Sequence, residues 1–324
     1  MIKSVLVKKL FLSAFVFSTV FSTSCQTISK QEEAKVKILL PSGAPTLPSY
    51  SFIENNLADV VSDPTVIPAE FSKGEYPFIV FDSTKAQKIL DNQGENAKYE
   101  FAKMLTGGNF YLVGFNKNNE EVQKDDTVYG FMEASTPGML FKSIYDTKAK
   151  FDYNANSIAD LATVLSTIDN NYKVSGKIID WAVVAEPALS KLTNAFAKKK
   201  LNYTIINLQE KFYTKYNGKW DKHYICQAAL FVNKDFKEKN NSSYKSVMNT
   251  YKTSIDNLFN NFDSTLKCFS SKYTSQSFTN TFGFTLELLS KVQGENSKKN
   301  GFGVVPNSVS FNTEDIKKFN SLLK

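Results

Sequence analysis

The sequence has few of the residues that enzymes and metal sites use most. Its 324 residues include one histidine and three cysteines. No CxxC or HExxH spacing and no cluster of Cys and His occurs, so we expect no zinc site and no other metal site. The single histidine, His223, stands in a charged Lys-Trp-Asp-Lys-His segment that is typical of a surface or a hinge. The chain has few of the residues that usually act as nucleophiles or general bases. We therefore expect that it is not an enzyme and binds no cofactor.

Two of the three cysteines, Cys226 and Cys268, lie in the body of the chain. They can form a disulfide only if the fold brings their Cα atoms within about 7 Å. The alternative is two buried thiols, because free cysteine behaves as a small apolar residue.

The sequence contains no long cluster of basic residues, although its formal net charge is +7. The lysines are dispersed, and their tightest cluster is 198–200. This pattern argues against nucleic-acid binding. It fits a solvated lysine-rich surface, or attraction to anionic membrane headgroups. With 42% hydrophobic and 14% aromatic residues, the chain can bury a large core, and its length suits two lobes.

The first 25 residues have the three parts of an export signal. Three of the first nine residues are lysine, and an apolar run over 10–21 follows, which is too short to span a bilayer. The small residues 22–24 then precede Cys25, and this ending resembles a bacterial lipobox, although Ser22 stands where leucine is usual. We expect a signal peptide over 1–24, acylation of Cys25 and a polar tether over 25–34.

The resemblance implies a protein held on the extracytoplasmic face of the cell membrane by acyl chains at Cys25. The Asn- and Lys-rich composition is typical of a low-GC or mollicute-like bacterium. A plain secreted protein or an uncleaved anchor remains the alternative.

Behind the tether, short apolar runs alternate with helical patterns, which predicts an α/β fold. Several of the expected strands end in a turn rich in Ser, Thr, Gly or Pro that opens a helix. Ligands of open α/β sheets bind beyond the carboxyl ends of the strands, and such turns offer hydroxyls and backbone N–H groups there. Capping of a helix explains the same residues equally well. The expected strands are 36–40, 77–81, 110–115, 127–131, 180–184, 203–208 and 224–233.

The chain resembles the substrate-binding proteins of the nitrate, taurine, sulfonate and thiamine-precursor group of ABC importers. The resemblance covers nearly all of residues 35–324, and its most characteristic element is Ala185-Glu186-Pro187 between a strand and a helix. The segments that carry it are VKILLPSGAPTLPSY, FIVFDSTKAQKIL, LTGGNFYLVG, FMEASTPGML, DWAVVAEPALSKL, YICQAALFVN and GFGVVPNSVSF.

The resemblance implies a two-lobed type II periplasmic-binding-protein fold with two hinge crossings. Lobe one would comprise 35–108 plus 228–324, and lobe two 109–227. The crossings would fall near Gly107-Gly108-Asn109 and near Gln227. The lobes would close on a ligand by a hinge motion, and the closed form would be recognised by a membrane permease.

Carried over position by position, the resemblance also implies a set of ligand-binding residues. They come from two turns of lobe one, from the hinge, and from the helix starts of lobe two. The set is Ser42, Gly43, Ala44, Pro45, Thr46, Asp82, Ser83, Thr84, Thr106, Gly108, Asn109, Tyr111, Ser135, Thr136, Pro137, Trp181, Glu186 and Gln227.

Two kinds of residue in this set allow more than one interpretation. Tyr111 or Trp181 could stack on a ligand ring, or could pack in the core as aromatic residues of strands usually do. Glu186 could bind a cationic ligand group, or could cap neighbouring backbone, because a buried carboxylate needs partners.

The resemblance implies capture of a small organic solute, such as a vitamin precursor, a sulfonate or an amino-acid-like compound. The partners would be an ABC permease and its ATPase, and the protein would act as a monomer. The alternatives are a surface lipoprotein with an adhesive or structural role, or an enzyme on the same fold. A few relatives of this group carry out pyrimidine-precursor synthesis with His, Cys and iron, and His and Cys are scarce in this chain.

Overall fold

The computed structural model describes most of the body of the chain. The signal peptide, Cys25 and the tether that the sequence predicts lie outside the described part. The described residues are 36–117, 121–131, 133–145, 151–155, 158–294 and 301–323.

The first five-stranded sheet has the order β2-β1-β3-β12-β4. Strands β1, β2 and β3 pair in parallel, whereas β12 is antiparallel to both of its neighbours. The strands are almost continuously apolar because helices cover both faces of the sheet. The body around this sheet is called lobe one below. Its strands are β1 Ile38–Pro41, β2 Ala58–Val61, β3 Phe78–Asp82, β4 Tyr99–Thr106 and β12 Ala228–Asn233.

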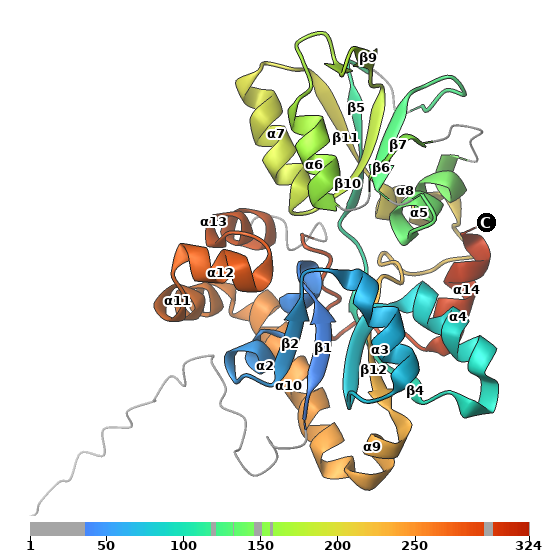
Figure 1. Ribbon diagram of the computed structural model, residues 1–324, viewed down its shortest axis with the longest axis vertical. Coiled ribbons are helices and arrows are strands. Elements are labelled where there is room, and N and C mark those ends of the chain that lie inside the picture. The colour runs from blue at the N-terminus through green and yellow to red at the C-terminus, as the bar shows by residue number, and fades with distance from the viewer. Residues whose placement is uncertain are drawn as a thin grey trace, which may run out of the picture.

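The second sheet has the order β11-β5-β10-β6-β7, and β5 is antiparallel to both of its neighbours. The body around it is called lobe two, and it lies above lobe one in Figure 1. Two further strands, β8 and β9, form a small hairpin at its far end. The strands are β5 Phe110–Phe115, β6 Val128–Phe131, β7 Phe151–Ala155, β8 Lys173–Val174, β9 Lys177–Ile178, β10 Trp181–Ala185 and β11 Tyr203–Asn207.

The helices begin where the sequence supplies caps. Asp82, for example, accepts hydrogen bonds from the backbone of Thr84 and Lys85 at the start of α4. The helices beside lobe one are α2 Tyr50–Glu54, α3 Ile67–Lys73, α4 Ser83–Gln93, α9 Lys234–Lys239, α10 Asn241–Asn260, α11 Phe262–Lys272, α12 Ser275–Phe282, α13 Leu286–Leu289 and α14 Thr313–Leu322. Those of lobe two are α5 Thr136–Tyr145, α6 Ile158–Ser166, α7 Ala188–Lys198 and α8 Leu208–Lys215. Short turns of helix are η1 Ala44–Thr46, η2 Pro64–Val66, η3 Gly94–Asn96 and η4 Ser290–Gly294.

The chain passes between the lobes after β4 and returns before β12. Both passages meet at Gly107, whose N–H donates to the carbonyl of Gly303 at 2.7 Å and whose carbonyl accepts from Ile225 at 2.8 Å. A Cβ on Gly107 would lie 2.5 Å from the Ile225 carbonyl oxygen. Three segments can therefore meet here only because residue 107 has no side chain.

Behind these crossings, the C-terminal helix α14 touches both lobes. It packs on α4 of lobe one, and its Phe319 lies 5.2 Å from Phe212 of α8 in lobe two, measured between ring centroids. Trp220, on the returning segment, is buried against both rings. One hydrophobic cluster is thus continuous across the back of the hinge.

The cysteines of the body do not pair with each other. Cys226 is a free, fully buried thiol beside the second crossing. Cys268, half-buried on α11, is not a free thiol, so the prediction of a buried thiol holds for Cys226 alone.

No helix among the described residues is long and apolar enough to cross a membrane.

Candidate functional site

A cavity of about 530 Å³ opens between the two lobes, at the carboxyl ends of β1, β2 and β10. This is the size of pockets that hold small organic molecules. Seven predicted site residues line it: Ser42, Gly43, Ala44, Pro45, Asn109, Glu186 and Gln227.

Glu186 brings a carboxylate to the lobe-two wall of this cleft. Glu186 is 7% exposed, and within the described structure its carboxylate accepts hydrogen bonds only from Ser190, from the backbone N–H at 3.2 Å and the hydroxyl at 2.9 Å. Burial raises the pKa of Glu186, and the bonds from Ser190 and the charge of Lys291 offset this only in part. The capping role does not exclude the predicted ligand role, because each carboxylate oxygen keeps a lone pair for a further donor.

Asn109 and Gln227 connect the two crossings at the floor of the cleft. The Gln227 side chain accepts from the N–H of Gly108 and donates to the Asn109 side chain, both at 3.2 Å. Asn109 has a left-handed backbone with φ of 76°, and its carbonyl accepts from the N–H of Glu186 at 3.2 Å. A ligand that touches these amides would contact both hinge segments and the Glu186 strand at once.

The turn after β1 forms the lobe-one wall. The N–H of Gly43 donates to the carbonyl of Phe282 at 3.1 Å, which fixes the turn against α12. Thr46 is fully buried and donates to the carbonyl of Gly43 at 2.7 Å, so it supports the turn from below and does not line the cavity.

The sequence reasoning missed a second turn on the same wall. The residues after β2 line the mouth of the cleft, and Asp63 accepts from the N–H of Thr65 there. The short strand β2 gave a weak pattern, but Ser-Asp-Pro-Thr directly after an apolar run is the same kind of signal that identified the other turns. The lining residues missed are Pro41, Ser62, Asp63, Pro64, Thr65, Phe110, Phe131, Ala162, Ala185, Pro187, Ala188, Lys191 and Gly283.

Two predicted ligand loops contact each other instead of the cavity. Thr136, at the start of α5, donates to Asp82 at 2.9 Å, and its hydroxyl lies 3.4 Å from that of Thr84. Thr84 and Thr136 are each 1% exposed. Ser83, Ser135 and Pro137 are buried beside them and do not line the cavity, so the hydrogen bonds between the two loops involve Asp82, Thr84 and Thr136 alone among these residues.

Three further predicted residues lie away from the cavity wall. Thr106 accepts the N–H of Ala228 within lobe one at 3.3 Å. The N–H of Gly108 donates to the side chain of Gln227 and so links the two crossings. Tyr111 packs in the core of lobe two, where burial raises the pKa of its phenol and the charge of Glu186 adds to that rise.

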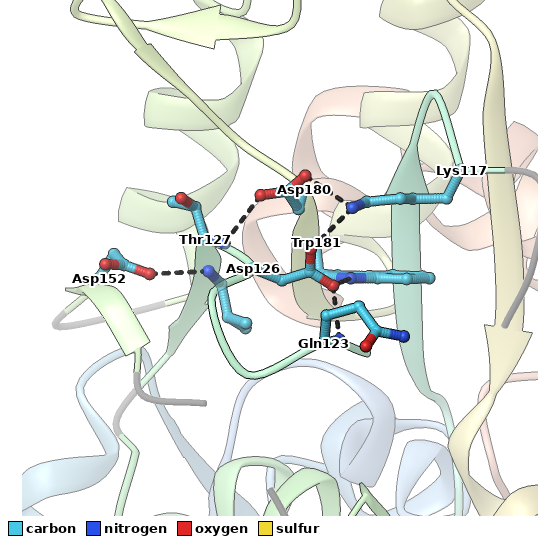
Figure 2. A network of polar contacts seen from close by, with 8 residues as sticks. Lys117, Gln123, Asp126, Thr127, Asp152, Asp180 and Trp181 are labelled. Carbon is cyan, nitrogen blue, oxygen red and sulfur yellow. Dashed lines mark hydrogen bonds and ion pairs between the residues drawn. The ribbon is translucent and has the colours of Figure 1, made fainter. Parts of the chain in front are cut away.

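Trp181 is a core residue at the far end of lobe two, and we remove it from the candidate site. It is fully buried, and its indole N–H donates to Asp126 at 2.7 Å. Figure 2 shows Lys117 between two carboxylates beside this ring, with Nζ 2.8 Å from Asp126 and 2.7 Å from Asp180. Residue 181 begins its strand at the end remote from the cleft, whereas Glu186 follows that strand at the cleft.

The network in Figure 2 makes a testable contribution to the stability of lobe two. Lys117→Met would leave two partly buried carboxylates without their cation, which is expected to lower the free energy of unfolding by about 2 kcal/mol. Lys237→Met is the matched control, because Lys237 and Glu100 are each 38% exposed and such pairs contribute about 0–1 kcal/mol. Chemical denaturation would measure both changes, and equal losses would contradict the role of the network.

The same network predicts a loss of stability in acid. Burial alone would raise the pKa of Asp126, but hydrogen bonds from Lys117, Gln123 and Trp181 outweigh it and lower the pKa below its ordinary 3.8. The folded state therefore releases this proton more readily than the unfolded chain. Its contribution is complete above pH 3.8 and is lost as the pH falls through the lowered pKa.

The groups that line the cleft offer charge and hydrogen bonds to a small molecule. They are two carboxylates, one lysine, two amides and several hydroxyls, set among alanine, proline and phenylalanine side chains. His223 lies elsewhere, stacked on Tyr213 at 4.0 Å between ring centroids. Within the described residues, no group of three or more His, Cys, Asp or Glu side chains could hold a metal ion.

Neither a protein-family model nor a curated protein matches the sequence. Solved structures match its fold. The periplasmic aliphatic sulphonate-binding protein of Escherichia coli has a TM-score of 0.57 at 12% identity, covering 89% of this chain and 85% of that one. The alkanesulfonate-binding protein of Xanthomonas axonopodis, bound to MOPS, has a TM-score of 0.55 at 11% identity, covering 89% and 94%.

A Candida albicans protein described as having the generic periplasmic binding protein fold is also similar. Its TM-score is 0.54 at 10% identity, covering 89% of each chain. These likenesses confirm the fold that the sequence predicts: α/β and two-lobed, of the periplasmic-binding-protein type.

Proposed function

We propose that this protein is the solute-binding component of an ABC importer, which captures a small organic molecule between its lobes and delivers it to a membrane permease. The observation that carries the proposal is the cavity of about 530 Å³ that both lobes line, around the buried Glu186. Its lobes correspond to 35–108 plus 228–324 and to 109–227. Acylation of Cys25 would hold it on the extracytoplasmic face, with the ATPase acting through the permease.

The lining residues favour a solute with a hydrogen-bond-donating, cationic group. A carboxylate in an apolar wall binds such a group strongly, since neither partner competes with much water. The chain contains no arginine, so its permanent cations are lysines, and Lys191 is the lysine among the described lining residues. An acidic end of the solute could face Lys191 at the exposed rim. The carboxylate of Glu186 would repel a solute that carries only negative charge. A zwitterionic, amino-acid-like solute therefore fits the cleft better than a simple anion does.

Native mass spectrometry of the freshly purified protein tests this proposal, since a trapped solute would travel with it in one-to-one ratio. Thermal unfolding with added compounds then ranks candidates. A ligand that binds only the folded state adds about 2.7 kcal/mol at a concentration one hundred times its Kd. We expect zwitterions such as taurine or an amino acid to raise the melting temperature, and ethanesulfonate to leave it unchanged. The proposal fails if no solute travels with the protein and no organic solute stabilises it.

A further inference from the structure

A second cavity, of about 690 Å³, lies within lobe one, away from the interlobe cleft. Its lining comes from β2 and α2 on one side and from α12 and the residue between α11 and α12 on the other. These elements lie at the left of lobe one in Figure 1. The polar residues that matter here are Ser42, Glu54, Asn56, Tyr273, Asn280 and Thr281.

The second cavity is separated from the cleft by a wall of backbone. The Gly43 N–H donates to the carbonyl of Phe282 at 3.1 Å, and a Cβ on Gly283 would lie 3.2 Å from the Gly43 nitrogen. Ser42, Ser62 and Gly283 line both cavities. The two spaces are therefore neighbouring sites with a common wall.

Glu54 carries an unsatisfied carboxylate oxygen in this cavity. Its side chain is 4% exposed, and Oε2 pairs with Lys272 Nζ at 2.9 Å. Oε1 is buried and has no hydrogen-bond partner. A buried charged oxygen without a partner is costly, and the terminal torsion of glutamate is soft enough to turn Oε1 toward the cavity. An O–H or N–H group bound there would satisfy it.

The other polar groups are neutral and offer both donors and acceptors. The side chains of Ser42, Asn56 and Thr281 make no hydrogen bond within the described structure, and Asn280 uses only its oxygen, which accepts from Gln276 at 2.8 Å. Burial, with the Glu54 charge, raises the pKa of Tyr273 to about 12, so its phenol is a neutral O–H donor.

These groups do not favour charged ligands. Lys272 already compensates the charge of Glu54, so the pair has no net charge with which to attract a cation or an anion. A molecule with many hydroxyls can give and accept hydrogen bonds in several directions at once. The apolar side chains of Ile53 and Val60 complete the lining and suit the C–H surface of such a molecule.

We propose that lobe one carries a second binding site, distinct from the interlobe cleft, for a neutral polyhydroxylated ligand of the sugar class, with Glu54 as its central acceptor. The proposal goes beyond solute capture between the lobes and does not depend on it. The site has the volume of a small-molecule pocket, a buried acceptor without a partner, and a ring of uncharged hydrogen-bonding groups.

Saturation-transfer NMR of the full chain with glucose, N-acetylglucosamine, maltose, trehalose and inositol tests the proposal. We expect at least one of these probes to bind. Glu54→Gln should weaken that binding about 10-fold, because the amide replaces the charged acceptor. Asn280→Ala, at an exposed position where misfolding is not expected, should weaken it as well. Glu100→Gln on the distant edge of the sheet is the matched control and should change nothing.

Two results would overturn the second site. One is that none of the five probes binds at concentrations of about 10 mM, which exceeds even the 1 mM Kd of a weak complex. The other is that a probe binds equally well to the parent protein and to both variants. Asn109→Ala, in the interlobe cleft, separates the two proposals, since it should leave sugar binding intact whether or not the cleft binds a solute.

Discussion

Replacing Glu186 with glutamine is expected to weaken solute binding by about 10- to 100-fold, because a hydrogen bond to a charged group contributes about 1.5–3 kcal/mol. The side chain keeps its shape, and the amide oxygen can still accept from Ser190. The loss would therefore come from the missing negative charge. Isothermal titration with the solute that travels with the protein measures it.

The same substitution should leave the empty protein at least as stable as before. Burial raises the pKa of Glu186, so the folded state holds this proton more tightly than the unfolded chain does. Between the ordinary value of 4.5 and the raised pKa, stability falls as the pH rises, and the ionised carboxylate remains a cost above that window. Glutamine removes this cost, so denaturation curves should show an advantage for Glu186→Gln near neutral pH that disappears below pH 4.5.

Glu314→Gln on α14 serves as the control for both measurements. Glu314 is exposed and pairs only with the exposed Lys317 in the described structure, so its substitution should change neither affinity nor stability appreciably. A Glu186→Gln protein that binds its solute normally would show that the carboxylate serves only as a cap for α7. A variant that both loses binding and unfolds more easily would contradict the argument from burial.

The sequence predicted those parts of the fold in which local pattern and tertiary structure agree. Apolar runs at 36–40, 77–81 and 110–115 became β1, β3 and β5, since their side chains are buried on both faces of a sheet. The strand expected over 224–233 begins only at Ala228, because the segment before it forms the crossing and gives its hydrogen bonds to Gly107.

Strand β4 was missed for a related reason. Glu100 and Lys103 interrupt its apolar residues, and β12 pairs with it through an irregular register. The strand carries the chain into the first crossing, so its neighbours across the sheet, and not its own pattern, determine its conformation.

For the cleft, sequence reasoning found the turns but could not tell which of them would face the cavity. The turns at 42–45 and at Glu186 line it, whereas those at 82–84 and 135–137 meet each other. All of them are short turns of small or polar residues and proline at the end of a strand, so composition does not separate them. Which turn lines the cavity depends on how the two lobes lie against each other, a relation between distant segments that no local pattern records.

The contact between those two turns leads to the second large effect. Thr136→Val keeps the volume of the side chain but removes the hydroxyl that donates to Asp82 at 2.9 Å. Asp82 would then lose its partner across the lobes, at a cost of about 1–3 kcal/mol in the closed form alone. The solute-free protein should open, and small-angle scattering should detect a larger radius of gyration.

Solute affinity should fall with the population of the closed form, because the apparent Kd is the intrinsic Kd divided by the fraction of molecules that can bind. A shift of 1–3 kcal/mol corresponds to a loss of about 5- to 150-fold, even though Thr136 does not line the cavity. Thr204→Val is the matched control, since the Thr204 hydroxyl donates to the carbonyl of Lys117 within lobe two. If the Thr136 and Thr204 variants bind alike, contact between the turns contributes nothing to closure, and affinity would then depend only on residues such as Glu186 that line the cleft.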